Sequence, residues 1–320
     1  MKKTPSIIFM GTPEFATASL KVLYENNYDI KAVVTATDKP AGRGRNLRIS
    51  DVKKYALEKN LNILQPNNLK DEKFINELKS LDADLFVVVA FRMLPKSVWE
   101  IPKMGCFNLH ASLLPNYRGA TPINHAIISG ETKTGVTSFF INENIDTGDI
   151  ILQETVEIKE DFSAGDLHDI LKTKAAGLVL KTVEVIASKN YQTISQNNIP
   201  EKNIKPAPKI TKEFCKINWN NNCDDLHNFI RGLSPYPTAY TKIINKNNEE
   251  KLLKIFKTDY LNEKHNLNPG TISSDNKTYI KIACKDGYIV INELQIEGKK
   301  HMNISDFLRG NNINDYKSID

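Results

Sequence analysis

The sequence predicts an α/β fold in which a Rossmann-like parallel sheet, covered by helices, is followed by a small β-barrel. In the first half, short apolar runs alternate with segments of helical periodicity, the βαβα order typical of a parallel sheet with helices on both faces. In the last third, short β-rich runs are separated by turn dipeptides, as in a small OB-like barrel. With 320 residues, 40% of them hydrophobic, the chain is long enough for two domains with separate cores.

The local pattern of apolar residues predicts the strands and helices in the first half of the chain. The first strand is the apolar run IIFM, which ends at the turn GTP, and the helix after it places Phe15, Ala18 and Val22 on one face. By the same criteria we expect strands at 7–10, 31–36, 85–90, 106–111 and 135–141, and helices at 14–24, 51–59, 71–81, 122–129 and 163–187. The turn GTPEFA has one glycine where the dinucleotide fingerprint has three, so a nicotinamide cofactor is not expected.

The composition changes after residue 189. The stretch NYQTISQNNIPEKNIKPAPK is polar, contains three prolines and has no apolar period, which indicates an interdomain linker. We therefore expect a first domain at 1–189, a linker at 190–208 and a second domain at 209–320. In the second domain we expect a helix at 224–232 and strands at 239–244, 252–258, 279–284 and 288–294.

Several classes of protein are disfavoured by the composition. The longest apolar run, residues 85–91, is too short to span a bilayer, and the N-terminus does not have the form of a signal peptide. The cysteines show no CxxC or His/Cys metal spacing, so we expect thiols in a reducing compartment; they are Cys106, Cys215, Cys223 and Cys284. The sequence thus predicts a cytoplasmic protein without a membrane partner or a metal.

Residues 35–54 are strongly basic. Six Lys and Arg residues stand against two Asp residues, which gives this window a net charge of +4. Its centre, PAGRGR at 40–45, is expected to be neither helix nor strand because it combines proline with glycines. Lys39, Arg43 and Arg45 are candidates for contact with a phosphate backbone. From the loop alone, a solvated surface segment is the favoured alternative.

The stretch CFNLHASLLPNYRGATP, at 106–122, carries the strongest chemical signal. Strand alternation places Asn108 and His110 on one face, at the carboxyl end of a parallel strand where ligands bind. An amide and an imidazole there can stabilise the oxyanion of an acyl transfer. Asp146, in the acidic turn INENIDTGDI, is a candidate partner for the imidazole.

Each of these residues also has a structural reading. A histidine at a strand end is more often structural than catalytic, and an Asp in a turn usually caps backbone amides. Cys106 and Ser112 lack an adjacent base, so we expect direct transfer to an amine without a covalent intermediate. The remaining histidines have no comparable setting and are expected to be structural; they are His125, His168, His227, His265 and His301.

The segments NLHASLLPNYRGATPINHAI and GVTSFFINENIDTGDI resemble the signature of the folate-dependent formyltransferases. This resemblance implies that 10-formyltetrahydrofolate is the donor. It implies that Asn108 and His110 stabilise the oxyanion, while Asp146 orients His110 and assists proton removal from the amine. It also implies a folate-binding turn made of Ser112, Leu113, Leu114 and Pro115. Ala111 stands where glycine is common in the family.

Four further segments narrow the resemblance. IIFMGTPEFA, DKPAGRGRNL, VVVAFRMLPK and GLSPYPTAYT resemble the members of the family that formylate the methionine of initiator tRNA, although AFRMLPK is one residue shorter than usual. This implies that the basic loop enters the acceptor-stem end. Lys209 and the C-terminal barrel would hold the tRNA backbone, and we expect a monomer.

Two alternatives remain open. One is a formyltransferase that acts on a nucleotide sugar or on glycinamide ribonucleotide. The other is a non-catalytic RNA-binding protein that keeps the fold.

Overall fold

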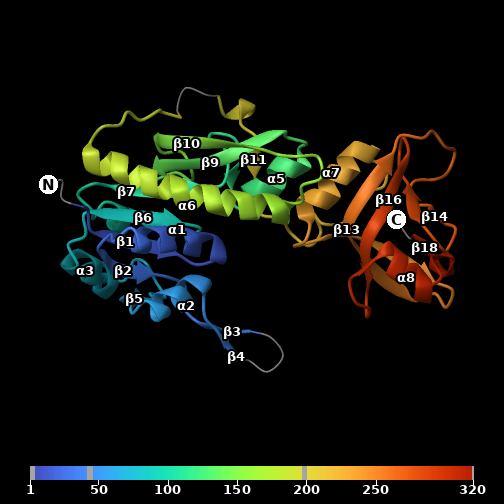
Figure 1. Cartoon of the computed structure of the whole chain (residues 1–320), viewed down its shortest axis with the longest axis horizontal. Helices are drawn as coiled ribbons and strands as arrows, with labels where there is room; N and C mark the ends of the chain where they lie inside the picture. Colours follow the sequence, from blue (N-terminus) through green and yellow to red (C-terminus); the bar gives the residue numbers. More distant parts are fainter. Residues whose placement is uncertain (1–3, 42–45, 197–199, 319–320) are drawn as a thin grey trace. The chain divides into compact units, whose positions relative to one another are not determined.

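The structure is a computed structural model that describes residues 4–41, 46–196 and 200–318 (Figure 1). The chain forms two compact units. The first consists of Met1–Pro122, Lys133–Glu157 and His168–Ala207, and the second of Ile123–Thr132, Ile158–Leu167 and Pro208–Asp320. Almost all of the stretch predicted to be a linker therefore lies within the first unit.

The first unit is built on a seven-stranded sheet of order β10-β9-β7-β6-β1-β2-β5. Its strands are β1 (Ile7–Gly11), β2 (Ile30–Val34), β5 (Ile63–Leu64), β6 (Leu85–Val89), β7 (Cys106–His110), β9 (Lys133–Phe140) and β10 (Ile150–Glu157). The five strands from β7 to β5 are parallel, which confirms the predicted sheet. β9 runs antiparallel to β7, and β10 antiparallel to β9.

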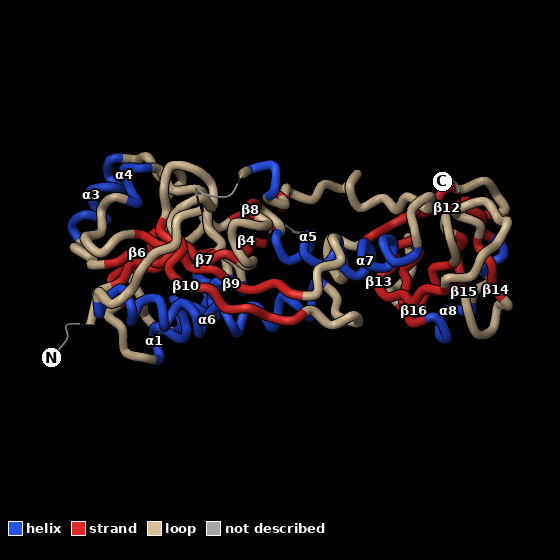
Figure 2. The backbone as a smooth tube through the Cα atoms, turned by 90° about the horizontal axis from the view of Figure 1, so that it is seen from above, coloured by secondary structure: helices blue, strands red, loops and turns tan. Residues whose placement is uncertain are grey.

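Helices cover both faces of this sheet, as predicted. They are α1 (Glu14–Glu25), α2 (Asp51–Glu58), α3 (Glu72–Ser80), α4 (Lys96–Trp99) and most of α6 (Ala164–Ser188), while all but the first residue of α5 (Pro122–Ile128) belongs to the second unit. Figure 2 shows α1 and α6 on one face and α3 and α4 on the other. Ser50 and Asp71 begin α2 and α3 by accepting backbone N–H bonds from Lys53 and Lys73, at 3.0 and 2.8 Å.

Apolar strands fix the centre of the sheet. Every residue of β1 and β6 is buried, which is what near-continuous apolar runs in a parallel sheet require. Gly11 ends β1 where a Cβ would lie 2.7 Å from the Cβ of Ala16, so α1 can follow the strand closely. This tight core holds the carboxyl end of β7 in place.

The second unit contains an antiparallel sheet of order β14-β15-β16-β13-β12-β18 that curves into a nearly closed barrel. Its strands are β12 (Ala239–Asn245), β13 (Glu250–Leu261), β14 (Ile272–Ser274), β15 (Ile280–Ala283), β16 (Tyr288–Ile296), β17 (Met302–Asn303) and β18 (Tyr316–Ser318). Its helices include α7 (Cys223–Leu233) and α8 (Ile304–Gly310). Trp219 is buried in its core and donates to the hydroxyl of Thr241 at 3.1 Å. The predicted helix and four strands are all present.

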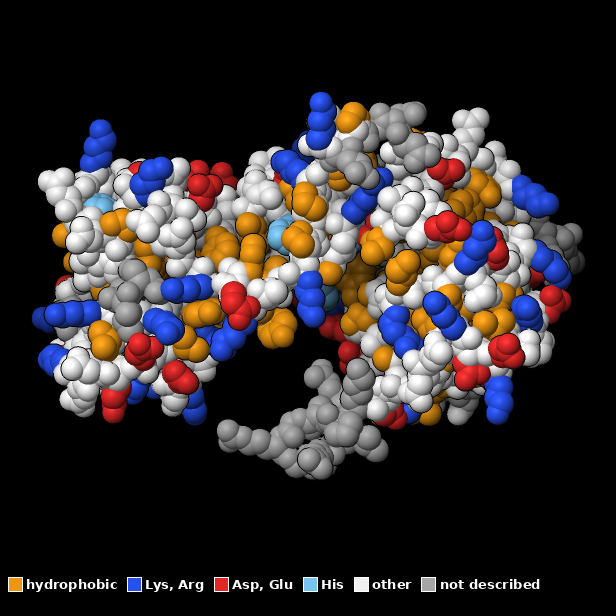
Figure 3. Space-filling model, turned by 180° about the vertical axis from the view of Figure 1, so that it is seen from behind, with side chains coloured by type: hydrophobic (Ala, Val, Ile, Leu, Met, Phe, Trp, Pro, Cys, Tyr) orange, Lys and Arg blue, Asp and Glu red, His pale blue; other side chains and the backbone are white. Residues whose placement is uncertain are grey.

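Charged side chains are spread over the surface that Figure 3 shows, with Lys and Arg among Asp and Glu. Within the described ranges, no helix combines the length and the apolar character needed to cross a membrane.

Candidate active site

β7 carries the predicted amide and imidazole to one end of the sheet. Asn108 lies opposite Val88 of β6 and Phe139 of β9, while His110 lies opposite Thr137 of β9. Two residues apart on a strand, the two side chains share a face. His110 is buried and Asn108 is partly buried, so both lie at the edge of the interior.

His110 is held from two sides. Its Nε2 lies 2.7 Å from the carbonyl oxygen of Tyr117 and donates to it, because a carbonyl can only accept. Its Nδ1 faces Asp146 Oδ2 at 3.7 Å, so the structure brings these two predicted residues together. The side chains of His110 and Asp146 are only 8% and 11% exposed. The ring is thus fixed, and Nδ1 is the nitrogen left for a ligand or a proton.

Asp146 is positioned by its own backbone and by a neighbouring loop. Its φ is 55°, in the left-handed region that few non-glycine residues adopt. Its Oδ2 accepts the backbone N–H of Gly119 at 3.0 Å. The same carboxylate oxygen therefore faces both a backbone donor and the imidazole. Asp146 thus bonds to a backbone amide, as expected of an Asp in a turn, and also lies beside His110, as expected of a partner for the imidazole.

Asn108 has an uncommitted polar atom. Its Oδ1 is buried and has no hydrogen-bond partner among the described residues. A buried polar atom without a partner is destabilising by about 1–3 kcal/mol, so a ligand that bonds to Oδ1 would remove this cost.

The predicted folate turn divides into inward and outward residues. Ser112 is fully buried and its hydroxyl donates to the carbonyl of Asn116 at 2.7 Å. Leu114 is also buried, and its backbone N–H and carbonyl bond to Thr137 and Gln153 at 3.2 and 2.9 Å. Leu113 and Pro115 remain partly exposed. These last two are the turn residues whose side chains are free to meet a ligand.

A second feature lies just beyond β6. A cavity of about 710 Å³ is lined by Asn67, Leu69, Lys70, Arg92, Met93 and Lys96, among others. The Arg92 guanidinium donates to the carbonyls of Asn67 and Pro66 at 3.0 and 2.7 Å, which fixes the segment after the strand.

The basic segment differs in part from its prediction. β3 (Lys39–Ala41) and β4 (Asn46–Arg48) form a two-stranded antiparallel ribbon, so Pro40 and Ala41 are in a strand after all. An isolated ribbon has two edges, and proline is tolerated on an edge. Arg43 and Arg45 lie outside the described residues, Lys39 pairs by its backbone with Arg48, and Lys209 is exposed in the second unit.

Three contacts at the site had no signal in the sequence. The Tyr117 carbonyl and the Gly119 amide are backbone groups, which any residue type provides. Gln196 comes from the polar stretch predicted to be a linker, yet its side chain is buried and bonds to the turn of Asp146. Its burial distinguishes it from Asn190, Gln192 and Asn203, the other amides of that stretch that the structure describes, which are exposed.

The cysteines are free and buried, as predicted. In the second unit, ligand atoms of Cys223, Cys284 and Asp286 lie within 4.8 Å of one another, a spacing that could hold a metal ion. No sequence pattern indicated this group, because the two cysteines are 61 positions apart. Both thiols lie in the apolar core, where burial raises the pKa of Cys223.

Comparison with known proteins gives a consistent result. Residues 5–183 match the family described as formyl transferase, and residues 209–312 match the formyl transferase C-terminal domain. A methionyl-tRNA formyltransferase of Flavobacterium johnsoniae is 52% identical over 313 residues, covering 98% of each chain. One of Bacteroides thetaiotaomicron is 46% identical over 315 residues, again covering 98% of each.

Solved structures of similar fold include sugar-modifying enzymes. WlaRD, described as a sugar 3N-formyl transferase, aligns with a TM-score of 0.66 and 24% identity, covering 93% of this chain and 100% of that one. An N-formyltransferase from Helicobacter canadensis aligns with a TM-score of 0.61 and 23% identity, covering 89% and 97%. At this identity the likeness shows a shared fold.

Proposed function

Because this chain belongs to the formyl transferase family, we propose that it transfers the formyl group of 10-formyltetrahydrofolate to the α-amine of methionine on initiator tRNA. The observation that carries the proposal is the meeting of Asn108, His110 and Asp146 at the end of β7. The donor supplies an activated formyl carbon. The residues fit such a co-substrate because Asn108 Oδ1 is a buried acceptor without an internal partner that can accept an N–H of the reacting groups, while the amide nitrogen of the same side chain can donate to the formyl oxygen.

The role of Asn108 is electrostatic. When the amine attacks, negative charge develops on the formyl oxygen, and an amide N–H at the edge of the interior can donate to it.

The role of His110 and Asp146 is to hold and move a proton. Since Nε2 is bonded to the carbonyl of Tyr117, a proton exchanged with the reacting groups would pass through Nδ1. The Asp146 carboxylate beside Nδ1 stabilises the ring when that nitrogen is protonated. Asp146 also assists removal of the proton from the attacking amine.

The acceptor is proposed from the relatives. Two formyltransferases named for methionyl-tRNA match nearly the whole chain, whereas the sugar enzymes share the fold at lower identity. The second unit argues against an enzyme specific for glycinamide ribonucleotide, which usually lacks one. The catalytic trio argues against a non-catalytic RNA-binding protein.

We assign tRNA binding to residues 209–320 together with Lys39, Arg43, Arg45 and Lys209. We assign folate binding to the turn at 112–115. The enzyme is proposed to act as a cytoplasmic monomer, which size-exclusion chromatography with light scattering would test.

One experiment tests the proposed reaction. Labelled 10-formyltetrahydrofolate is offered together with charged initiator tRNA, free methionine or a dTDP-amino sugar, in separate reactions. Label on the charged tRNA alone is the expected outcome. Transfer to the sugar would replace the proposed acceptor, and transfer to none of the three would refute the activity.

A further inference from the structure

We propose that Gln196 is a positioning residue for formyl transfer: it fixes the turn that carries Asp146 and so sets the carboxylate against His110. The inference rests on the proposed function, since it concerns the same chemistry. Gln196 lies in the polar stretch between α6 and the second unit, far in sequence from the residues it would position.

The turn that carries Asp146 is hydrogen-bonded within itself, with the Thr147 hydroxyl donating to Asn142 Oδ1 at 2.9 Å, but it has few apolar contacts. Asn142, Glu143, Asn144 and Ile145 are all exposed, so the loop has little apolar packing to hold it. Asp146 also adopts a positive φ, a conformation that persists only when its surroundings enforce it.

Gln196 supplies that support from a buried position, with its side-chain amide fully used. It is 3% exposed, and its Nε2 donates to the carbonyl of Asp146 at 3.1 Å and to that of Gly148 at 2.6 Å. Its Oε1 accepts from Nη2 and Nε of Arg118 at 2.8 and 3.3 Å. One side chain thus ties the Asp146 turn to the loop that contains Gly119, whose N–H binds the Asp146 carboxylate.

The backbone around Gln196 is also held against the site. Ile194 and Ile150 exchange two backbone hydrogen bonds of 2.9 Å, which places Gln196 beside the start of β10. Further along, β11 (Pro206–Ala207) pairs with β8 (Arg118–Gly119) on the other side of the same loop. The stretch therefore acts as a support for the catalytic carboxylate.

A positioning role predicts a specific kinetic signature. Gln196→Met keeps the length and approximate volume of the side chain and removes its hydrogen bonds. Gln196→Glu keeps an acceptor for Arg118 but loses the N–H donors to the turn. Both should lower kcat by roughly tenfold to a hundredfold, as small misplacements of catalytic groups do. The KM for charged tRNA and for the folate donor should each stay within about threefold of the wild-type value, because no binding contact is removed.

The matched control is Gln192→Ala, which removes an exposed glutamine of the same stretch. It should behave as wild type. Hydrogen exchange of a peptide that contains Gly119 gives a second readout that needs no activity: the Gly119 amide should exchange faster in both Gln196 variants and not in the control. Circular dichroism and thermal unfolding confirm that each variant is folded.

The inference is overturned if either folded Gln196 variant turns over like wild type, or if its loss is confined to a raised KM for tRNA. It is also overturned if Gly119 exchange is unchanged. A wild-type enzyme that formylates no acceptor would instead refute the proposed function, while the exchange measurement would still test the contact.

Discussion

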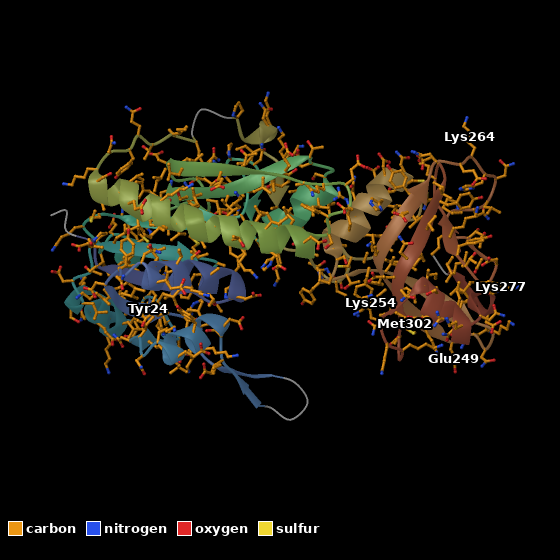
Figure 4. All side chains as sticks on the ribbon, in the orientation of Figure 1. Tyr24, Glu249, Lys254, Lys264, Lys277 and Met302 are labelled. Carbon is orange, nitrogen blue, oxygen red and sulfur yellow. The ribbon has the colours of Figure 1, made fainter. Side chains whose placement is uncertain are left out.

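At the end of β7, polar groups from separate segments share one buried cluster, whereas in the second unit Lys254, Lys264 and Lys277 stand apart at the surface. His110 and Asp146 are nearly inaccessible, and the bond from Nε2 and the Gly119 amide fix their geometry. Lys254, Lys264 and Lys277 are exposed and project from separate places on the second unit (Figure 4). The rate of a catalysed reaction depends on the placement of the catalytic groups to within fractions of an ångström. The attraction of a polyanion such as tRNA depends instead on the sum of many surface charges. Single changes should therefore have large effects in the cluster and small effects outside it.

The largest expected effect is loss of a group that acts on the reacting atoms. Asn108→Ala should lower turnover by roughly a hundredfold or more, because the charge on the formyl oxygen loses its stabilisation. His110→Ala should cause a loss of similar size, because the transferred proton loses its carrier. Binding of charged tRNA, measured by filter retention, should remain nearly unchanged. Wild-type turnover in either variant would remove that residue from the site.

The next prediction concerns cooperation within the cluster. If Asp146 acts through His110, the double variant Asp146→Ala, His110→Ala should be hardly worse than the poorer single variant, since residues that act as a unit fail together. The measurement is kcat/KM for the two single variants and the double. Losses that multiply would show that the carboxylate and the imidazole act independently.

A pair of glycines compares the two regions directly. At Gly148 a Cβ would lie 1.6 Å from the carbonyl oxygen of Phe140, whereas at Gly310 in α8 it would meet nothing within 4 Å. Gly148→Ala should lower the free energy of unfolding by about 1–3 kcal/mol, as overpacking does, and reduce kcat as the turn shifts. Gly310→Ala should leave both unchanged or slightly raise stability. Urea unfolding with parallel assays would test this, and equal stability in the two variants would contradict it.

The smallest expected effect concerns the basic loop. Arg43→Ala should weaken the binding of charged tRNA by roughly tenfold, which is the contribution of one charge-assisted hydrogen bond. Folate binding should remain intact. The slope of log affinity against log salt should fall by about one, and Arg43→Lys should recover part of the loss. Lys103→Ala is the control, because Lys103 is exposed and paired with Asp82 at 3.0 Å. If Arg43→Ala binds charged tRNA with the affinity and the salt slope of the wild type, the loop is solvated surface that does not contact the tRNA.

Much of the fold could be predicted because its signals are local. The buried runs of β1, β2, β6 and β7 and the helical faces between them are legible in the apolar pattern alone. β10 was not predicted, because its sequence IILQETVE interrupts the apolar run with polar residues. The ribbon at Pro40 was missed because turn-forming composition outweighed the tolerance of a sheet edge for proline.

The closeness of His110 and Asp146 agrees with the sequence analysis, where the resemblance to the formyltransferases singled out both residues. The groups that hold these residues in place could not be predicted from the sequence. The Tyr117 carbonyl and the Gly119 amide belong to the backbone, and the polar stretch near Gln196 is held by contacts with residues far away in sequence. The composition of a segment indicates how much apolar surface it can bury by itself. The described residues of this stretch are held instead by the residues that they contact.

The pairing of β11 with β8 also bears on where a fragment that contains the catalytic residues should end. The carbonyl of Ala207 accepts the backbone N–H groups of Ala120 and Thr121 at 2.8 and 3.3 Å, and the Tyr117 N–H donates to the carbonyl of Lys205. A fragment cut at 189, where the composition changes, would contain Asn108, His110 and Asp146 but lack Gln196 and this strand. A fragment that ends at Ala207 keeps both, although residues 123–132 and 158–167 within it group with the second unit. For expression, domain exchange or fusion, a fragment that carries these residues should therefore extend at least to the last residue of β11.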